Sequence, residues 1–209
     1  MKVLVLGATG GTGSLIVHDA LEKGHSVVAM VRSKASAPDL PGADIIEGDV
    51  RDVDALMCAL KGCDAVVSSL GTGLSPFNEV SLLTEATRAL VPAMKGSGVD
   101  RLVCISALGV GDSRGHGGFA FDRIFMPLLL RHAYKDKGRQ EDAIRASSLD
   151  WVIVRPAMLT NDPARGSLRA IADLAGVNGG KVARADVARF VVEQLATNTW
   201  LKQTPVLMW

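Results

Sequence analysis

Residues 3–21 read VLVLGATGGTGSLIVHDAL: an apolar run, a glycine cluster and then a helical pattern. The apolar run at 3–6 is short and ends at a glycine, as a buried strand does. Apolar residues then recur at the spacing of one helix face, at Leu15, Ile16, Ala20 and Leu21. Gly24 is a stop signal for that helix. The stretch therefore predicts a strand, a glycine turn and a helix, in that order.

The rest of the chain repeats this alternation. Short, mostly β-branched and apolar runs occupy residues 26–31, 44–47, 65–69, 101–106, 151–155 and 205–208. Helical patterns cover 52–60, 75 to about 94, about 121–146 and 186–196. In the second of these, Ser75 can cap the helix and Pro76 fits its first turn, while Pro92 is expected to kink or split it.

Strands that alternate with helices are joined by right-handed crossovers and form a parallel sheet. No internal repeat or low-complexity linker interrupts the series. The glycine-rich stretch at 109–118 fits a mobile rim loop better than a domain boundary. We therefore predict a single α/β domain over residues 1–209, with a doubly wound parallel sheet of the Rossmann type.

Composition and charge exclude several classes of protein. Hydrophobic residues make up 48% of the chain and charged residues 22%, as in ordinary globular proteins, and the net charge is +1. No basic stripe marks a nucleic-acid surface, and no apolar run approaches the ~18 residues that a membrane span needs. The three cysteines form no CxxC pair and no metal-ligand cluster with histidine. Because the first apolar run is too short for an export signal, we expect a cytoplasmic protein. We expect it to be a monomer or a homodimer that binds no metal, membrane or nucleic acid.

The turn Gly7-Ala8-Thr9-Gly10-Gly11-Thr12-Gly13 is typical of a phosphate-binding loop. Such a loop needs backbone N–H groups that face an anion at a helix N-terminus, with no side chain in the way. Gly7 allows the tight turn, Gly10 lets a diphosphate approach the backbone, and Gly13 lets the helix pack close to the sheet. Thr12 can donate its hydroxyl to a phosphate oxygen, and Thr9 and Gly11 complete the loop. Since the glycines follow a strand and open a helix, we predict dinucleotide binding here.

The end of the second predicted strand favours NADP(H) over NAD(H). In NAD-preferring folds, an acidic residue about 20 positions after the glycines accepts from the ribose 2′-OH. Here the strand runs into Arg32-Ser33-Lys34 without a carboxylate. Arg32 can pair with a 2′-phosphate and Ser33 can donate a hydrogen bond to it, although a merely solvated basic loop is the alternative. After the third strand, Asp49 and Val50 can lie beside the adenine. Asp49 can accept a hydrogen bond from the adenine amino group, or it can instead cap a helix.

Ligands of doubly wound sheets bind beyond the carboxyl ends of the strands. That rule selects residues after the fourth and sixth predicted strands: Leu70, Gly71, Thr72, Pro156 and Met158. Gly71 suits a close approach to a ribose. Ser106, which ends the fifth predicted strand, can hydrogen-bond a substrate carbonyl, or it can be a satisfied core serine.

These residues together resemble a known family, the atypical short-chain dehydrogenase/reductases. The resemblance rests on the glycine turn, on the strand end at 31–32, and on the stretches 70–76 (LGTGLSP), 98–100 (GVD), 105–107 (ISA), 148–156 (SLDWVIVRP) and 185–188 (ADVA). The combination is similar to the NmrA-like branch and its flavin reductase and biliverdin-IXβ reductase-like members, over nearly the whole chain. It implies an NADPH-dependent reductase, with flavins, quinones or tetrapyrroles among the family's substrates.

The chain departs from the superfamily at its catalytic motif. The wider superfamily uses Tyr-x-x-x-Lys, in which the lysine lowers the tyrosine pKa and holds the nicotinamide ribose, whereas here Tyr134 has Gly138 at that spacing. Lys137 is one residue early but shares a helix face with Tyr134, and its spacing to Glu141 resembles that of the NmrA-like lysine. The resemblance thus implies Lys137 as a ribose contact, against a solvated helix-face lysine, and Tyr134 as a candidate proton donor. Met158 stands where the tetrapyrrole-reducing members carry a histidine, which argues against biliverdin itself.

We therefore expect an NADPH-dependent reductase of a planar conjugated acceptor, a small molecule of flavin or quinone type, with Ser106, Lys137 and Tyr134 as catalytic candidates. Such an acceptor can take its proton from solvent, which would explain a broken Tyr/Lys pair. One alternative is an NADP(H)-binding sensor without turnover. Another is a nucleotide-sugar or isoprenoid-type epimerase or isomerase, which needs the intact acid–base pair.

Overall fold

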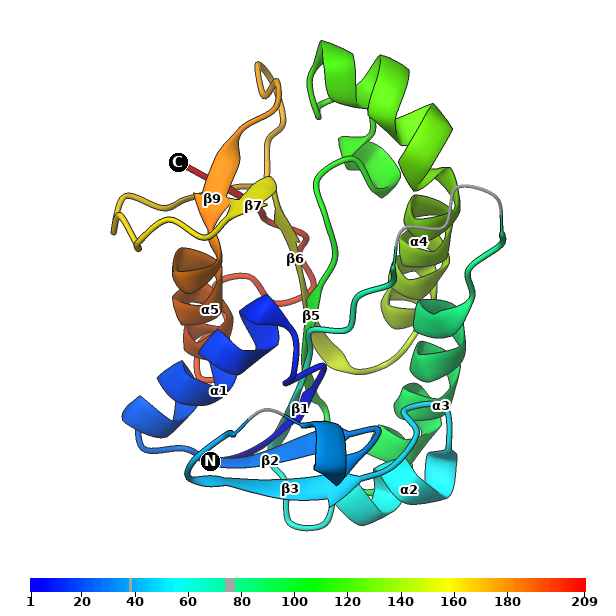
Figure 1. The fold of residues 1–209 in the computed structure, drawn as a ribbon, viewed down its shortest axis with the longest axis vertical. Coiled ribbons are helices and arrows are strands. Elements are labelled where there is room, and N and C mark those ends of the chain that lie inside the picture. The colour runs from blue at the N-terminus through cyan, green and yellow to red at the C-terminus, as the bar shows by residue number, and fades with distance from the viewer. Residues whose placement is uncertain (38, 74–77) are drawn as a thin grey trace.

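The central element of the structure is an eight-stranded sheet (Figure 1). The computed structural model describes residues 1–37, 39–73 and 78–209. The strands of this sheet are β1 (Lys2–Leu6), β2 (Ser26–Val31), β3 (Ala43–Glu47), β4 (Ala65–Ser68), β5 (Arg101–Ile105), β6 (Asp150–Pro156), β8 (Arg169–Ile171) and β10 (Val206–Met208). Their order is β3-β2-β1-β4-β5-β6-β10-β8, and every neighbouring pair is parallel except β10 with β8. The predicted doubly wound α/β fold is confirmed.

Helices cover both faces of the sheet. One face carries α1 (Gly11–Glu22) and α5 (Arg184–Glu193), and the other carries α2 (Val53–Ala59), α3 (Leu82–Gly96) and α4 (Arg131–Arg145) (Figure 1). Alternate residues of β1 divide between the two cores: Val3 and Val5 pack with α1 and α5, and Leu4 and Leu6 pack with the other three helices. Both faces of β1 are buried, which is why its sequence is continuously apolar.

The strand order reverses at β1, and this reversal positions the site. Leu6 of β1 lies opposite Met30 of β2 on one side and Ser68 of β4 on the other. The chain leaves β1 toward β3 and returns to β4 on the opposite side. At such a reversal, the loops that follow the two strands diverge and leave a crevice at the carboxyl edge of the sheet. The glycine turn follows β1 and residues 69–73 follow β4, so both segments lie at this edge of the sheet.

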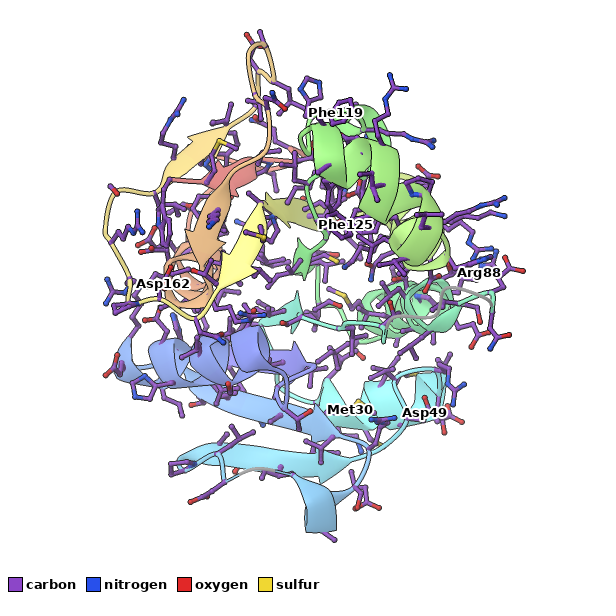
Figure 2. The ribbon with its side chains drawn as sticks, turned by 45° about the horizontal axis from the view of Figure 1, so that its top comes forward. Met30, Asp49, Arg88, Phe119, Phe125 and Asp162 are labelled. Carbon is purple, nitrogen blue, oxygen red and sulfur yellow. The ribbon has the colours of Figure 1, made fainter. Side chains whose placement is uncertain are left out.

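The third helix differs from its predicted extent. The predicted start at Ser75 and Pro76 lies outside the described residues, whereas residues 78–81 are not helical and α3 begins at Leu82. Of the two predicted effects of Pro92, the split is wrong, because α3 continues through it to Gly96, and the kink stays a prediction. Proline removes the donor for the carbonyl of Arg88, but Arg88 is exposed (Figure 2), so water can replace that donor.

Two further regions are built differently from the sequence pattern. The predicted single helix at 121–146 is a π-helix, Phe121–Leu130, followed by α4. The segment after β6 forms β7 (Met158–Thr160), which pairs in parallel with β9 (Lys181–Ala183) in a separate two-stranded sheet. Strands of three residues are too short for hydrophobic alternation to reveal them. Short 3-10 turns occupy Lys34–Ser36 and Gly111–Ser113.

Candidate functional site

Two glycines of the turn after β1 are required by the path of the backbone. Gly7 has a φ of +81°, and a Cβ at this position would lie 2.5 Å from the carbonyl oxygen of Ser69. A Cβ on Gly13 would lie 2.0 Å from the carbonyl oxygen of Gly7. The turn is closed by a hydrogen bond of 3.0 Å from the Gly10 N–H to the Gly7 carbonyl. The G-x-x-G-x-x-G spacing therefore holds a tight turn that keeps side chains away from the start of α1.

The turn leaves main-chain groups open at the N-terminus of α1. Thr9, Gly10 and Gly11 are exposed, while the Thr12 side chain is buried. The first N–H groups of a helix have no partner within the helix, and the helix dipole adds partial positive charge there. The first turn of α1 contains no acidic residue. These features fit a bound anion such as the diphosphate of a dinucleotide.

A carboxylate that the sequence analysis missed lies beside the basic loop after β2. Arg32 is exposed there, and Ser33 is partly buried. Glu47, at the end of β3, accepts a hydrogen bond of 2.8 Å from the Lys34 main-chain N–H. The two strands pair with Val31 opposite Glu47. This contact could have been predicted only from the register of the two strands, which residue spacing alone does not give.

Asp49 follows β3 and lies exposed at the same edge (Figure 2). Its two carboxylate oxygens accept hydrogen bonds from the Arg51 guanidinium, the shortest of them 2.6 Å from Nη2 to Oδ2. These bonds from Arg51 lower the pKa of Asp49 to about 2. The helix-capping alternative for Asp49 is wrong, because Asp52 caps α2 by accepting from two N–H groups of its first turn. Val50 packs its side chain in the core, which leaves only its main chain for a ligand.

Ser106 follows β5 and has a buried hydroxyl without a partner. Its Oγ makes no hydrogen bond to any residue that the structure describes, although its side chain is inaccessible to solvent. The Ser106 N–H donates to the Val154 carbonyl at 2.7 Å, which fixes the residue at the strand end. The satisfied-serine alternative is therefore wrong, because the buried hydroxyl has no hydrogen-bond partner among the described residues. After the adjacent strand β4, Leu70 and Thr72 are partly buried and Gly71 is exposed.

Lys137 lies on α4, partly buried against β5. Burial lowers the pKa of Lys137, although Cys104, Glu141 and Asp136 act in the opposite direction. Within the described part of the chain, its ammonium has no hydrogen-bond or ion-pair partner. The alternative of a solvated helix-face lysine stays open. A partly buried cation without a direct partner among the described residues can contact a ligand hydroxyl or phosphate.

Tyr134 lies one helical turn before Lys137, in a different environment. Its ring packs edge to face with Phe121, with 5.7 Å between the ring centroids. Burial, with the nearby charge of Asp122, raises the pKa of Tyr134 to about 12. The residue lines a cavity of about 760 Å³ between the rim loop, the π-helix and α4. Three cations also line this cavity: Arg114, Arg131 and Lys135.

One buried arginine joins three parts of this edge, and the sequence analysis missed it. Arg155 of β6 donates from Nε and Nη2 to the two carboxylate oxygens of Glu141 on α4, at 3.0 and 2.6 Å. Its Nη1 donates to Oδ1 of Asp112 in the rim loop at 2.6 Å. Burial opposes ionisation of Asp112, but the hydrogen bond and charge of Arg155 prevail and lower its pKa. The rim loop is therefore anchored at Asp112.

The segment after β6 brings Met158 to the surface. Pro156 ends β6 and is buried, whereas Met158 begins β7 and is 58% exposed. The Met158 N–H donates to the Gly180 carbonyl at 3.2 Å, which ties it to the segment before β9. Met158 thus presents a large apolar side chain at the carboxyl edge. Phe119 and Phe125, on the segment that leads into and forms the π-helix, are also exposed (Figure 2).

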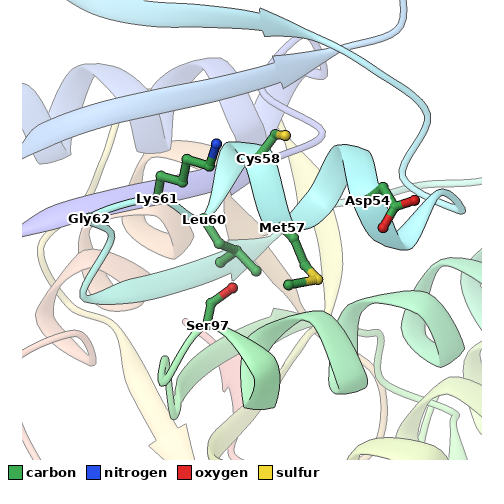
Figure 3. Close-up of a pocket in the computed structure, with 7 residues that line it drawn as sticks. All are labelled: Asp54, Met57, Cys58, Leu60, Lys61, Gly62 and Ser97. Carbon is green, nitrogen blue, oxygen red and sulfur yellow. The ribbon is translucent and has the colours of Figure 1, made fainter.

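A second cavity lies at the opposite edge of the sheet (Figure 3). It measures about 420 Å³ and is lined by Asp54, Met57, Cys58, Leu60, Lys61, Gly62 and Ser97. Three of these residues lie on α2, three follow α2 on the way to β4, and Ser97 follows α3 on the way to β5. The cavity therefore lies beside the amino ends of the strands, away from the glycine turn and from the edge where such sheets bind ligands.

Several kinds of site are missing from the described residues. No group of three His, Cys, Asp or Glu side chains is placed to hold a metal ion there. The three cysteines are free thiols. Across residues 1–37, 39–73 and 78–209, none of the helices has both the length and the apolar character that a bilayer crossing requires.

Comparison with known proteins gives the following matches. The sequence pattern of an NAD(P)H-binding family matches residues 7–198. YhfK of Bacillus subtilis (strain 168), named an uncharacterized sugar epimerase, is 30% identical over 204 residues, which cover 93% of this chain and 88% of that protein. ChuY, an anaerobillin reductase from Escherichia coli O157:H7, has a TM-score of 0.84 at 25% identity, over 100% of this chain and 97% of the other. A short-chain dehydrogenase/reductase from Veillonella parvula DSM 2008, solved with NADP, has a TM-score of 0.81 at 18% identity, over 100% and 94% of the two chains, which shows a shared fold.

Proposed function

The chain belongs to the NAD(P)H-binding family, and on that premise we propose that it is an NADPH-dependent reductase of a planar conjugated acceptor, of flavin or quinone type. The observation that carries the proposal is a contrast: the glycine turn after β1 is complete, whereas the Tyr/Lys acid–base pair is incomplete. The turn has the glycines that a diphosphate requires, while Tyr134 has a pKa of about 12 and lacks the lysine four residues later. A tyrosine in this state is a poor proton donor.

The acceptor class follows from that weak donor. A carbonyl substrate needs an acid beside it when the hydride arrives, whereas a reduced flavin or quinone can take its proton from water. In the proposed reaction the acceptor gains a hydride and a solvent proton, and NADP⁺ is released. The motifs that resemble the flavin reductase-like members of the NmrA-like branch support this class. So does ChuY, which is named a reductase and matches across the whole chain.

The proposal assigns a ligand contact to each of the following residues of the site. The turn from Gly7 to Gly13 holds the diphosphate, and Arg32 with Ser33 holds the 2′-phosphate, which selects NADPH. Residues 70–72 approach a ribose. The Lys137 ammonium contacts the nicotinamide ribose, and the Ser106 hydroxyl hydrogen-bonds the acceptor. Bound NADPH would supply the hydride, and the protein's contribution is position and exclusion of water.

A second candidate function is an NADP(H)-binding sensor, which the incomplete Tyr/Lys pair favours. An epimerase, as the name of YhfK suggests, is less well supported because epimerisation needs the acid–base pair that Tyr134 and Lys137 do not form. We place the reductase in the cytoplasm, where its three thiols stay reduced.

The test is to follow NADPH absorbance with FMN, riboflavin, menadione and biliverdin in turn. We expect oxidation with a flavin or with menadione and tighter binding of NADPH than of NADH. Thermal unfolding with NADPH, NADP⁺ and NADH measures binding separately, since ligand at 100-fold its Kd adds about 2.7 kcal/mol of stability. Tight NADPH binding without oxidation by any acceptor would exclude the reductase and leave the sensor.

A further inference from the structure

We infer that Arg184 is a nucleotide-binding residue that closes the diphosphate site over the start of α1. The inference rests on the proposed function, because it adds a contact to the same dinucleotide site. It also accounts for Gly11, a glycine that the G-x-x-G-x-x-G spacing does not require.

Arg184 and Gly11 are the first residues of two neighbouring helices. α1 and α5 pack side by side on one face of the sheet (Figure 1), with α1 beginning at Gly11 and α5 at Arg184. A Cβ on Gly11 would lie 3.3 Å from Nε and 3.4 Å from Cδ of Arg184. The guanidinium therefore lies next to the open main chain of the glycine turn, in space that a side chain at position 11 would crowd.

The Arg184 guanidinium forms no ion pair with a described carboxylate. Its guanidinium donates from Nη1 to Oδ1 of Asn161 at 2.7 Å, and no described carboxylate pairs with it. Asn161 is neutral, so it orients the cation without balancing its charge. By contrast, Arg51 and Arg155 each pair with a carboxylate at 2.6 Å.

The placement of this cation beside the N-terminus of α1 is also unfavourable in the absence of an anion, because the first turn of α1 contains no acidic residue. Helix N-termini carry partial positive charge, and basic side chains are normally stabilising at the other end. Arg184 lies beside the N-terminus of α1 as well as at that of α5, and only α5 has an acidic residue, Asp186, in its first turn. A diphosphate would reverse the sign of this arrangement, because its oxygens can accept from the guanidinium and from the first N–H groups of α1 together.

The test separates the diphosphate from the rest of the nucleotide. Arg184→Gln, Arg184→Lys and the matched control Arg189→Gln, an exposed arginine on the same helix, are titrated with NADPH, NADH and adenosine 2′-monophosphate. The last probe carries the 2′-phosphate and lacks the diphosphate. We expect Arg184→Gln to weaken both NADPH and NADH about tenfold or more, with adenosine 2′-monophosphate unchanged. Arg184→Lys should give an intermediate loss, and Arg189→Gln should bind all three probes like the parent protein.

Two results for the variant would overturn the inference: NADPH affinity of Arg184→Gln equal to that of the parent, or an equal loss for all three probes. The second would mean that Arg184 supports the fold rather than the diphosphate, and ligand-free thermal unfolding would then show the same defect. Failure of the parent protein itself to bind NADPH and NADH would instead overturn the proposed function, and the inference with it.

Discussion

Arg32 is exposed at the end of β2, and in our proposal its guanidinium holds the phosphate that distinguishes NADPH from NADH. We expect Arg32→Ala to weaken NADPH by about 1.5–3 kcal/mol, which is about tenfold or more in Kd, because a hydrogen bond to a charged group is lost. The affinity for NADH, which lacks that phosphate, should change little. Calorimetric titration with both nucleotides measures the difference.

Lys34 provides the control for Arg32, because its side chain is also exposed in the same basic loop. If only the positive charge of the loop matters, Lys34→Ala will weaken NADPH as much as Arg32→Ala does, and the specific assignment fails. The nearby Glu47 carboxylate accepts a hydrogen bond from the main-chain N–H of Lys34, which the substitution of the Lys34 side chain leaves in place.

Substitution of Tyr134 tests whether its hydroxyl acts as the proton donor. We expect Tyr134→Phe to keep most of the reductase activity, since burial raises the tyrosine pKa to about 12 and makes it a weak acid at neutral pH. A general acid in the transition state contributes about 100-fold or more, so its removal is easily measured. The kcat of the parent should also show no tyrosine ionisation between about pH 6 and pH 9. A 100-fold loss in the phenylalanine variant would restore Tyr134 as the proton donor.

At the residue scale, the sequence predicts contacts made within one local segment. Gly7 and Gly13 could be assigned because the tight turn between a strand and a helix requires both within seven residues. Glu47 and the Arg155–Glu141 pair could not, because each depends on which strand or helix lies alongside. The free hydroxyl of Ser106 was equally hidden, since its burial and lack of a partner follow from tertiary packing.

At the scale of elements, α3 is capped by a side chain from another helix. Asp136 of α4 is fully buried and accepts hydrogen bonds from the N–H groups of Leu83 and Thr84, at 2.9 and 3.1 Å, and from the Thr84 hydroxyl at 2.5 Å. We expect Asp136→Ala to lower the free energy of unfolding by about 2 kcal/mol or more, because the first turn of α3 loses its acceptor. Urea unfolding measures the loss.

The exposed Asp142 on the same helix supplies the matched control, and Asp142→Ala should change the stability little. Asp136→Asn keeps one acceptor oxygen and should fall between the parent and the alanine variant. Equal stability of Asp136→Ala and the parent would show that water caps α3 instead. The cap also explains why the predicted start of α3 was misplaced: the acceptor lies 52 residues away in the sequence, so local capping signals point elsewhere.

Elements were predictable where periodicity extends over enough residues. The strands β1, β2, β4, β5 and β6 are buried on both faces, so their sequences are largely apolar and predict them well, whereas β3 is only partly buried. The three-residue strands β7, β8 and β9 carry no such pattern, and their hydrogen bonds to one another or to β10 define them. The change from π-helix to α4 near Leu130 is likewise set by packing, because the apolar spacing of residues 121–146 fits one helix.

At the scale of the whole molecule, Asp186 joins segments that are far apart in the chain. It lies in the first turn of α5, is buried, and accepts from the Arg165 and Gly166 N–H groups at 3.0 and 3.3 Å and from the Trp209 indole at 2.9 Å. The Arg165 guanidinium lies 3.7 Å from the Trp209 ring centroid. One carboxylate therefore holds the loop before β8, the residue after β10 and the start of α5, the helix that also carries Arg184.

The ionisation of Asp186 links this junction to pH. Burial raises its pKa, but the hydrogen bonds from Arg165, Trp209 and Gly166 outweigh burial and lower it below 3.8. A carboxylate with a lowered native pKa contributes stability above its unfolded pKa, and this stability is lost as pH falls through the native pKa.

We expect Asp186→Asn to reduce the free energy of unfolding by about 1–3 kcal/mol at pH 7. This deficit should shrink below about pH 4 as the parent's carboxylate is protonated. Urea midpoints across that range measure it, with the exposed Asp162→Asn (Figure 2) as the control. A deficit that stays constant down to the lowest pH would contradict this expectation, because it would mean that the loss in the asparagine variant does not come from the ionised carboxylate.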